Sequence, residues 1–235
     1  MPIERKLTVE FIGTFMLVFT VGMAVANAGD LAPLAIGAAL TVMVFAGGHV
    51  SGAHYNPSVS VAVYPRSKMT PDELGAYAAT QLVAAVLAGL VVVMLGFDPE
   101  DAAALAGAGK MLVAEFVFTF ALVWVILNVA TARGTEGNSF YGVAIGFAVM
   151  AGAFSVGAVS GAAFNPAVAV GAMVIGLLSW GDIWIYLLAN LGGAAAAAFV
   201  FLFTQPAEKA RGDTRAAEPG GAAPDTERAA RPRNR

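Results

Sequence analysis

Two asparagines, each followed by proline, have the type and spacing to do chemistry in this chain. Asn56 and Asn165 each open a short apolar segment, at residues 56–64 and 165–176, that is too short to cross a bilayer. Asn is a favourable N-cap and Pro loses no hydrogen bond at the first helical position, so each pair predicts the start of a short helix. Capping alone would explain one copy, whereas two copies at matched places favour a shared site.

The two predicted short helices would bring their positive dipole ends and both Asn amides to one point within a membrane. Such a point repels cations. Water passing it could only accept hydrogen bonds from the amides, so its oxygens would turn inward and a proton relay would be broken. We therefore predict a pore constriction formed by Asn56, Pro57, Ser58, Asn165, Pro166 and Ala167.

The chain that leads into each Asn cannot be helical, so its carbonyl groups should face a wet path and replace bulk water around a solute. The predicted pore-lining backbone comprises Gly52, Ala53, His54, Gly161 and Ala163. His49 and His54 lack a carboxylate partner nearby in the sequence. We interpret both as loop-packing or vestibule residues and predict no metal site.

Apart from Glu73, which is the first residue of the predicted span 73–96, Glu10 and Glu115 are the only acidic residues inside the predicted spans. A carboxylate in a membrane is costly enough to need a partner. A proton-coupled transporter would use the pair as relays, whereas structural braces would accept hydrogen bonds from the re-entrant backbone. The symmetric placement of the two residues favours braces.

Composition sets the class of protein, because 58% of the 235 residues are hydrophobic and 12% are charged. Soluble globular domains carry about 45–50% apolar and about 25% charged residues, so a soluble fold is excluded. The lack of cysteine excludes disulfides, thiolate metal sites and cysteine nucleophiles. The sequence shows no nucleotide loop, catalytic triad or phosphate-binding element, so we expect no enzyme activity, no cofactor and no nucleic-acid partner.

Long runs almost free of charge predict an all-α membrane protein with six transmembrane helices and two re-entrant half-helices. We expect a membrane domain at 7–204, between a cytoplasmic N-terminus at 1–6 and a disordered cytoplasmic tail at 205–235. The predicted spans lie at 7–27, 31–49, 73–96, 111–131, 139–158 and 183–204.

An internal repeat is the most specific organisational signal. The run EFIGTFMLV, which starts at Glu10, reappears 105 residues later as EFVFTFALV, which starts at Glu115, and Ser-Gly-Ala-x-x-Asn-Pro recurs at an offset of 109. Three predicted spans separate the copies, at about 7–96 and 111–204, so the second copy should lie inverted relative to the first. This architecture is typical of transport proteins with a shared site near the membrane midplane.

The distribution of Lys and Arg predicts which side of the membrane each end faces. Cytoplasmic termini would place inside Arg5, Lys6, Arg66, Lys68, Arg133 and the seven basic residues after Gln205. Only Lys110 would lie outside, in loops that carry Asp30, Asp98, Glu100, Asp101 and Asp182. We therefore expect a multi-pass protein of the plasma membrane with both termini in the cytoplasm.

The motifs Ser-Gly-Ala-His-Tyr-Asn-Pro at 51–57 and Ser-Gly-Ala-Ala-Phe-Asn-Pro-Ala at 160–167, with the repeat and both span carboxylates, resemble the aquaporin and aquaglyceroporin (major intrinsic protein) family. The resemblance covers about residues 5–204. It implies a homotetramer with one pore per subunit, both asparagines at the central constriction and both glutamates as braces of the two loops.

Two departures from the family pattern bear on selectivity. The first motif ends in Ser58 in place of the usual Ala, which should alter loop packing, and Val168 stands where most members carry an Arg. By the family's spacing, the selectivity filter comprises Ile36, Ala153, Ala162 and Val168. A filter without the Arg and the usual His should be wider and more apolar. We therefore expect passage of water or small uncharged solutes such as ammonia, urea, hydrogen peroxide or short polyols.

Two other functions stay open. A proton-coupled secondary transporter would also use an inverted repeat and the carboxylates of Glu10 and Glu115, and it predicts flux that depends on a pH gradient. A closed structural membrane protein would be compatible with an apolar filter, and it predicts no flux.

Overall fold

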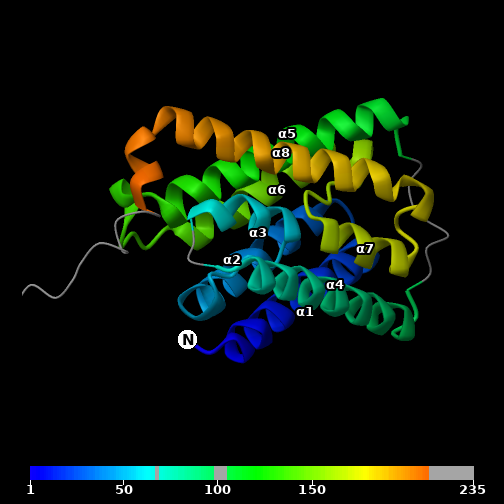
Figure 1. Ribbon diagram of the computed structural model, residues 1–235. Coiled ribbons are helices and arrows are strands. Elements are labelled where there is room, and N and C mark those ends of the chain that lie inside the picture. Colours follow the sequence, from blue (N-terminus) through cyan, green and yellow to red (C-terminus); the bar gives the residue numbers. More distant parts are fainter. Residues whose placement is uncertain (67–68, 98–104, 212–235) are drawn as a thin grey trace, which may run out of the picture.

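A computed structural model describes residues 1–66, 69–97 and 105–211, with side chains as far as residue 208 (Figure 1). Lys68, the predicted outer acids Asp98, Glu100 and Asp101, and the predicted disordered tail from residue 212 onwards lie outside the described residues. The described part contains helices and no strand, which confirms the predicted all-α class.

Six long helices and two short helices make up most of the described chain. The long helices are α1 (Ile3–Ala28), α2 (Ala32–Ser51), α4 (Pro71–Met94), α5 (Ala108–Ile126), α6 (Tyr141–Ser160) and α8 (Ile183–Thr204), and the short ones are α3 (Pro57–Val63) and α7 (Pro166–Ile175). A π-helical turn at Leu127–Thr131 extends α5. Shorter 3-10 turns lie at Gly29–Leu31, Tyr64–Arg66, Arg133–Thr135, Trp180–Asp182 and Pro206–Arg211.

The long helices are apolar enough to cross a membrane. Five stretches of the described residues meet the length and hydropathy requirements, and the first, Ile3–Ser51, contains both α1 and α2. α3 has seven residues and α7 has ten. At about 1.5 Å per residue neither can cross a hydrocarbon layer of about 30 Å. The chain is therefore a multi-pass membrane protein in which α3 and α7 do not span.

The structure extends beyond the predicted membrane domain at both ends. α1 begins at Ile3, inside the predicted N-terminal segment 1–6, because Glu4 and Lys6 are good helix formers although they are polar. After α8, the chain forms a further helical turn at Pro206–Arg211, in a segment predicted to be disordered. Polar contacts of that turn, described below, hold it against the helices.

The packing of the helices reflects the sequence repeat. α1 packs against α2 and α4, and α5 packs in the same way against α6 and α8. The two halves then interlock, since α3 of the first half packs against α8 and α7 of the second half packs against α4. Figure 1 shows α3 and α7 between the long helices, extending away from the middle of the molecule. This interlocked arrangement places the starts of both half-helices at its centre.

The two halves also meet where α2 crosses α6 at a matched pair of glycines. A Cβ atom added to Gly37 would lie 2.8 Å from the carbonyl oxygen of Gly146, and one added to Gly146 would lie 2.4 Å from the carbonyl oxygen of Gly37. Small residues at such a crossing let two membrane helices approach backbone to backbone. This close approach fixes the relative position of the helices that flank α3 and α7.

Candidate functional site

Each half-helix begins at an asparagine side chain. Asn56 Oδ1 accepts a hydrogen bond from Ser58 N at 2.9 Å, and Asn165 Oδ1 accepts one from Ala167 N at 2.9 Å and a longer one from Val168 N at 3.4 Å. Pro follows each Asn at the first helical position, where no backbone donor is needed. Both amide oxygens are therefore occupied by the helix that they cap, which turns the amide nitrogens outward.

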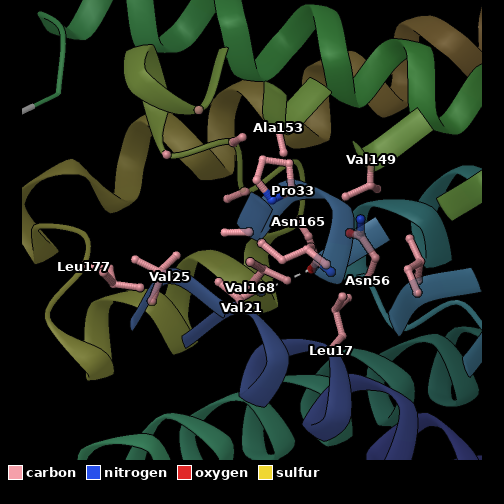
Figure 2. Close-up of a pocket in the computed structure, with 18 of the residues that line it drawn as sticks. Leu17, Val21, Val25, Pro33, Asn56, Val149, Ala153, Asn165, Val168 and Leu177 are labelled. Carbon is pink, nitrogen blue, oxygen red and sulfur yellow. Dashed lines mark hydrogen bonds between the residues drawn. The ribbon is translucent and has the colours of Figure 1, made fainter. Parts of the chain in front are cut away.

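The two asparagines meet through crossed hydrogen bonds. Asn56 Nδ2 donates to the carbonyl oxygen of Phe164 at 2.9 Å, and Asn165 Nδ2 donates to the carbonyl oxygen of Tyr55 at 2.8 Å. Each amide nitrogen carries two hydrogens, so one N–H of each remains for another acceptor. Both side chains line a single cavity, as Figure 2 shows. The structure thus brings together the two residues that the sequence placed 109 positions apart.

The loops before the asparagines adopt an unusual backbone conformation. Ala53, Tyr55, Ala162 and Phe164 have positive φ angles between 49° and 52°. This left-handed conformation is uncommon for residues with a side chain, and it persists only where the surroundings hold it. α2 and α6 end just before these loops at left-handed glycines in matched positions.

Glu10 supplies the contacts that hold the first loop. Its carboxylate accepts hydrogen bonds from Ser51 Oγ at 2.6 Å, His54 N at 3.0 Å, Tyr55 N at 2.7 Å and Gln81 Nε2 at 2.9 Å. Glu10 is fully buried. Every contact comes from a donor, so the carboxylate satisfies backbone N–H groups that the non-helical loop leaves without helical partners.

Glu115 makes the same kind of contacts with the second loop. Its carboxylate accepts hydrogen bonds from Ser160 Oγ at 2.7 Å, Ala163 N at 3.0 Å and Phe164 N at 2.7 Å, and it is fully buried. A tyrosine hydroxyl donates a further hydrogen bond to the start of each loop. Tyr77 donates to the Ser51 carbonyl and Tyr186 to the Ser160 carbonyl, at 2.8 Å and 2.6 Å.

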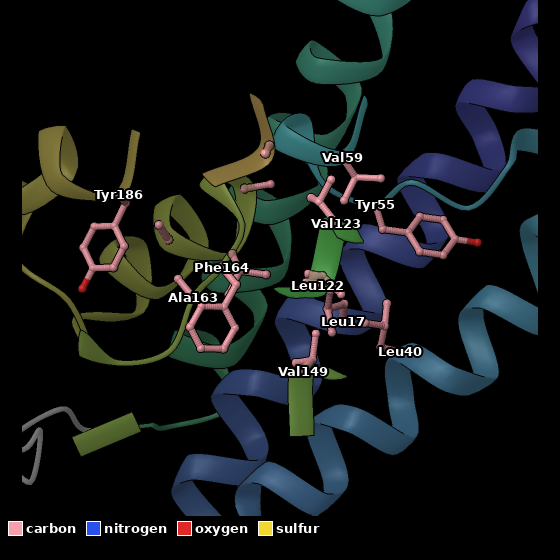
Figure 3. Close-up of a cluster of buried hydrophobic side chains, with 14 of the residues drawn as sticks. Leu17, Leu40, Tyr55, Val59, Leu122, Val123, Val149, Ala163, Phe164 and Tyr186 are labelled. Atoms are coloured by element: carbon pink, nitrogen blue, oxygen red, sulfur yellow. The ribbon is translucent and has the colours of Figure 1, made fainter. Parts of the chain in front are cut away.

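The rings of the residues before the asparagines anchor the loops in the surrounding helices. Figure 3 shows the Tyr55 and Phe164 rings pointing away from each other. The Tyr55 ring packs where Gly13 and Gly47 leave space, and its hydroxyl donates to the Met43 carbonyl. Both rings are about 1% exposed. The loops are therefore held from the outer side by packing and from within by the carboxylates.

The loop held by Glu10 has polar contacts that the loop held by Glu115 lacks, and these contacts were not predicted from the sequence. Gln81 Nε2 reaches Ser60 Oγ as well as Glu10, and Ser60 Oγ lies 3.0 Å from His54 Nδ1. His54 lines the cavity but belongs to no cluster of potential metal ligands within the described residues. The Ser58 hydroxyl, buried in the first turn of α3, has no hydrogen-bond partner.

A cavity of about 600 Å³, here called the larger cavity, contains the predicted filter. Ile36, Ala153, Ala162 and Val168 all line it, together with both asparagines. Four of the five residues predicted to line the pore through their backbone also border it, namely Ala53, His54, Gly161 and Ala163. None of the four filter residues has a polar side chain, so the wall is apolar at this level.

The helix faces that line the larger cavity were not identified from the sequence. Lining residues recur four positions apart, which places them on one face of each helix. They also come in pairs related by the repeat, namely Leu17 with Leu122, Val21 with Ile126, Ile36 with Ile145, and Leu40 with Val149. Spacing combined with the repeat offset is the signal that would have found them.

The structure contains a second cavity of about 390 Å³, here called the smaller cavity. Gly52 and His49 line it, as does the connection between α5 and α6. Ala53, Val59, Ile126 and Ile145 border both cavities, so the two adjoin. Each predicted site residue therefore borders one of the two cavities, lies in the first turn of α3 or α7, or holds one of the two loops.

Comparison with known proteins identifies the family. Residues 1–201 match the family described as Major intrinsic protein. The chain belongs to the major intrinsic protein family. This result confirms the resemblance inferred from the Asn-Pro motifs.

Several curated members of the major intrinsic protein family are similar to the chain over most of its length. Aquaporin NIP3-1 from Arabidopsis thaliana is 34% identical over 221 residues, which cover 84% of this chain and 66% of that protein. Aquaporin NIP1-4 from Oryza sativa subsp. japonica is 37% identical, with 84% and 76% covered. Nodulin-26 from Glycine max is 34% identical, with 91% and 82% covered. The chain spans just under two thirds of the first of these relatives.

A solved structure shares the fold. The X-ray structure of the aquaglyceroporin from Plasmodium falciparum has a TM-score of 0.75 and 20% sequence identity, and the match covers 88% of this chain and 99% of that one. The likeness supports the architecture of six long helices and two half-helices described above.

Proposed function

We propose that the protein is a passive transmembrane channel for water and small uncharged solutes. The crossed hydrogen bonds of Asn56 and Asn165 carry this proposal, because they bring two half-helix starts and two amides to one point on a cavity wall. The remaining N–H of each amide would donate to the oxygen of a passing molecule. A solute that accepts hydrogen bonds and carries no charge suits such a point.

The same geometry supports exclusion of ions and protons. The N-terminal ends of α3 and α7 carry positive partial charge, which opposes entry of cations and protons. Water oriented by two donors at the constriction would point its oxygen toward them and could not relay a proton inward. Selectivity against charge would rest on these groups alone, since the filter lacks the Arg that most members of the family carry.

The filter supports solutes larger than water. Val168 stands at the position of the usual Arg, and none of the other predicted filter residues is a His. The absence of both side chains removes hydrogen-bond donors and side-chain volume from the wall of the larger cavity. Ammonia, urea, hydrogen peroxide and short polyols fit a wider wall with few fixed polar contacts, and loop carbonyls would supply the acceptors that replace their water.

The contacts of Glu10 and Glu115 favour a passive channel over a proton-coupled transporter. A relay must exchange protons with water, whereas both carboxylates are fully buried and neither lines the larger or the smaller cavity. Their oxygens are occupied by loop donors. We therefore assign both residues the role of loop braces. The adjoining cavities likewise favour a channel over a closed structural protein.

The proposal extends to assembly and location. Large apolar side chains are exposed along the long helices, for example Val83, Leu90 and Phe147, where lipid or a second copy of the chain would cover them. A homotetramer in the plasma membrane, with both termini in the cytoplasm, agrees with this surface and with the distribution of basic residues. Chemical crosslinking in native membranes, followed by mass measurement, tests the tetramer.

Stopped-flow light scattering on proteoliposomes tests the function. Vesicles that contain the full chain should take up urea and glycerol faster than empty vesicles, at equal rates with and without a pH gradient. Uptake no faster than in empty vesicles would remove the proposal of a wide filter. Uptake that requires a pH gradient would favour the transporter.

A further inference from the structure

A buried guanidinium joins three distant segments at the end of the bundle where α3 finishes. The Arg66 side chain is 4% exposed and donates through Nη2 to Glu208 Oε2 at 2.6 Å and through Nη1 to the Glu208 carbonyl at 3.0 Å. It also donates to Thr131 Oγ1 and to the Thr131 carbonyl, each at 2.9 Å. The guanidinium lies 4.7 Å from the centre of the Phe201 ring. Arg66 thus contacts both the α5–α6 connection and the chain beyond α8.

Glu208 completes the cluster from the other side. Its second carboxylate oxygen accepts a hydrogen bond from Arg133 N at 2.9 Å. Burial raises the pKa of the Glu208 carboxyl, but hydrogen bonds from Arg133 and Arg66 and the charges of both arginines outweigh burial and lower this pKa below its usual value. Gln205 Nε2 adds a bond to Asn128 Oδ1 at 2.7 Å. The bonds of the Glu208 carboxylate with Arg66 and with Arg133 N are charge-assisted, and such bonds are among the stronger hydrogen bonds in proteins.

The α5–α6 connection that these residues hold forms part of the wall of the smaller cavity. Thr131, Ala132 and Thr135 line that cavity. The connection runs through a π-helical turn and a 3-10 turn, so no regular helix fixes its backbone. Ala132 is 7% exposed and lies between Thr131, which Arg66 contacts, and Arg133, which Glu208 contacts. The wall residue at the centre of the connection is therefore held from both sides.

The opposite half of the molecule has no equivalent cluster in the described residues. The repeat offset of 109 pairs Arg66 with Ile175, which is 2% exposed and ends α7 in apolar surroundings. One half-helix is thus anchored by packing and the other by a charged cluster whose partner comes from the chain after α8. A polar anchor of this kind can be released, whereas an apolar anchor cannot without exposing the core.

We propose that Arg66 and Glu208 form a latch that positions the α5–α6 connection and thereby keeps the smaller cavity open to permeating molecules. The latch consists of the Arg66 and Glu208 side chains with their bonds to Thr131 and Arg133. The segment Gln205–Glu208 is then a positioning element for permeation. The effect on flux rests on the proposed channel function, whereas the effect on the connection does not.

The lack of cysteine in the chain gives a direct test. In Ala132→Cys, the introduced thiol is unique, and its reaction with a maleimide reports how often the connection opens. Glu208→Gln, added to this variant, keeps the side-chain size but removes the charge and presents N–H groups where acceptors are needed. The labelling rate should rise by about tenfold or more, because hydrogen bonds to charged groups are among those that cost most to lose. An unchanged rate overturns the latch.

Two further variants keep the test decisive. Glu73→Gln is the matched control, since it makes the same change in a partly exposed ion pair with Lys6, at 3.7 Å, and should leave labelling unchanged. Arg66→Met combined with Glu208→Leu removes both buried charges together, so neither is left unpaired if Glu208→Gln fails to fold. This double variant should also label faster than the parent, and labelling at the parent rate overturns the latch.

Solute uptake by proteoliposomes separates positioning from simple support. Released from the latch, the connection should move into the smaller cavity, so urea uptake by the Glu208→Gln chain should fall at least about twofold while its melting temperature in detergent stays near that of the parent. Faster labelling with unchanged uptake would overturn the role in permeation. If the parent chain itself carries no solute, the channel proposal fails, and the labelling result still decides the latch.

Discussion

Replacing Glu115 by Gln tests whether the span carboxylates are braces. In the native chain its two oxygens accept bonds from Ser160 Oγ, Ala163 N and Phe164 N. Gln offers one oxygen and one NH₂ group, so in either orientation at least one backbone N–H faces another donor. The Ser160 hydroxyl can rotate to accept instead, but the two amides cannot. Glu115→Gln should therefore leave one buried backbone donor without a partner.

The expected cost follows from these contacts. A buried donor left unsatisfied costs about 1–3 kcal/mol, and the bonds that remain lose the added strength that a charged acceptor confers. We expect a total of roughly 2–4 kcal/mol. For a chain of this size, about 2–4 °C of melting temperature corresponds to each kcal/mol, so the midpoint should fall by roughly 5–15 °C. Glu10→Gln should cost at least as much, since Glu10 accepts from four donors.

Thermal unfolding in detergent, followed by intrinsic fluorescence, measures the effect. Glu4→Gln, at an exposed carboxylate at the start of α1, is the control and should leave the midpoint unchanged. The brace assignment would be refuted if the Glu115→Gln chain has the same melting midpoint as the native protein but loses the solute uptake that a pH gradient drives. That result would point to a proton relay.

Three further predictions concern the filter, the α2–α6 crossing and the latch. Val168→Arg should narrow the larger cavity and add donors, so proteoliposome uptake of urea should fall several-fold while water flux persists. Gly146→Ala should destabilise the protein by about 1–3 kcal/mol, because its Cβ would lie 1.9 Å from Thr41 Oγ1. Gly75→Ala, with open space around it in α4, should raise the melting temperature slightly, because Ala is the better helix former. The Glu208 pKa is lowered in the cluster with Arg66 and Arg133, so the latch stabilises the α5–α6 connection locally above the usual carboxyl pKa of 4.5, and this local stabilisation is lost as pH falls below it. Because maleimide labelling is slow at acidic pH, hydrogen exchange of the backbone amides in the connection measures this loss. After correction for the intrinsic exchange rate, the exchange rate should stay constant from neutral pH to about pH 5 and rise in stronger acid.

Much of the candidate site could be predicted because each of its main features occurs in both copies of the sequence repeat. The repeat offset pairs Asn56 with Asn165 in the sequence, and the structure places each within hydrogen-bond reach of the other's loop. Glu10 and Glu115 stood out because a carboxylate in a span needs a partner. In both cases a local rule of chemistry and the repeat agreed.

The features that escaped prediction depend on partners far apart in the chain. In the sequence Arg66 is only one of several basic residues, because its partner Glu208 lies 142 residues away in a segment without apolar periodicity. That segment looked disordered by composition, yet burial of a paired charge orders its first turn. Helix ends shifted by a few residues for a related reason, since polar helix formers such as Glu4 extend α1 past its apolar part.

The most direct test of the central claim is a simultaneous measurement of swelling and internal pH in proteoliposomes loaded with a pH-sensitive dye. If the crossed asparagines form a constriction that admits neutral molecules and interrupts a proton relay, vesicles exposed to urea should swell faster than empty vesicles while their internal pH stays constant under an imposed proton gradient. Swelling at the rate of empty vesicles, or swelling accompanied by rapid acidification, would contradict this account.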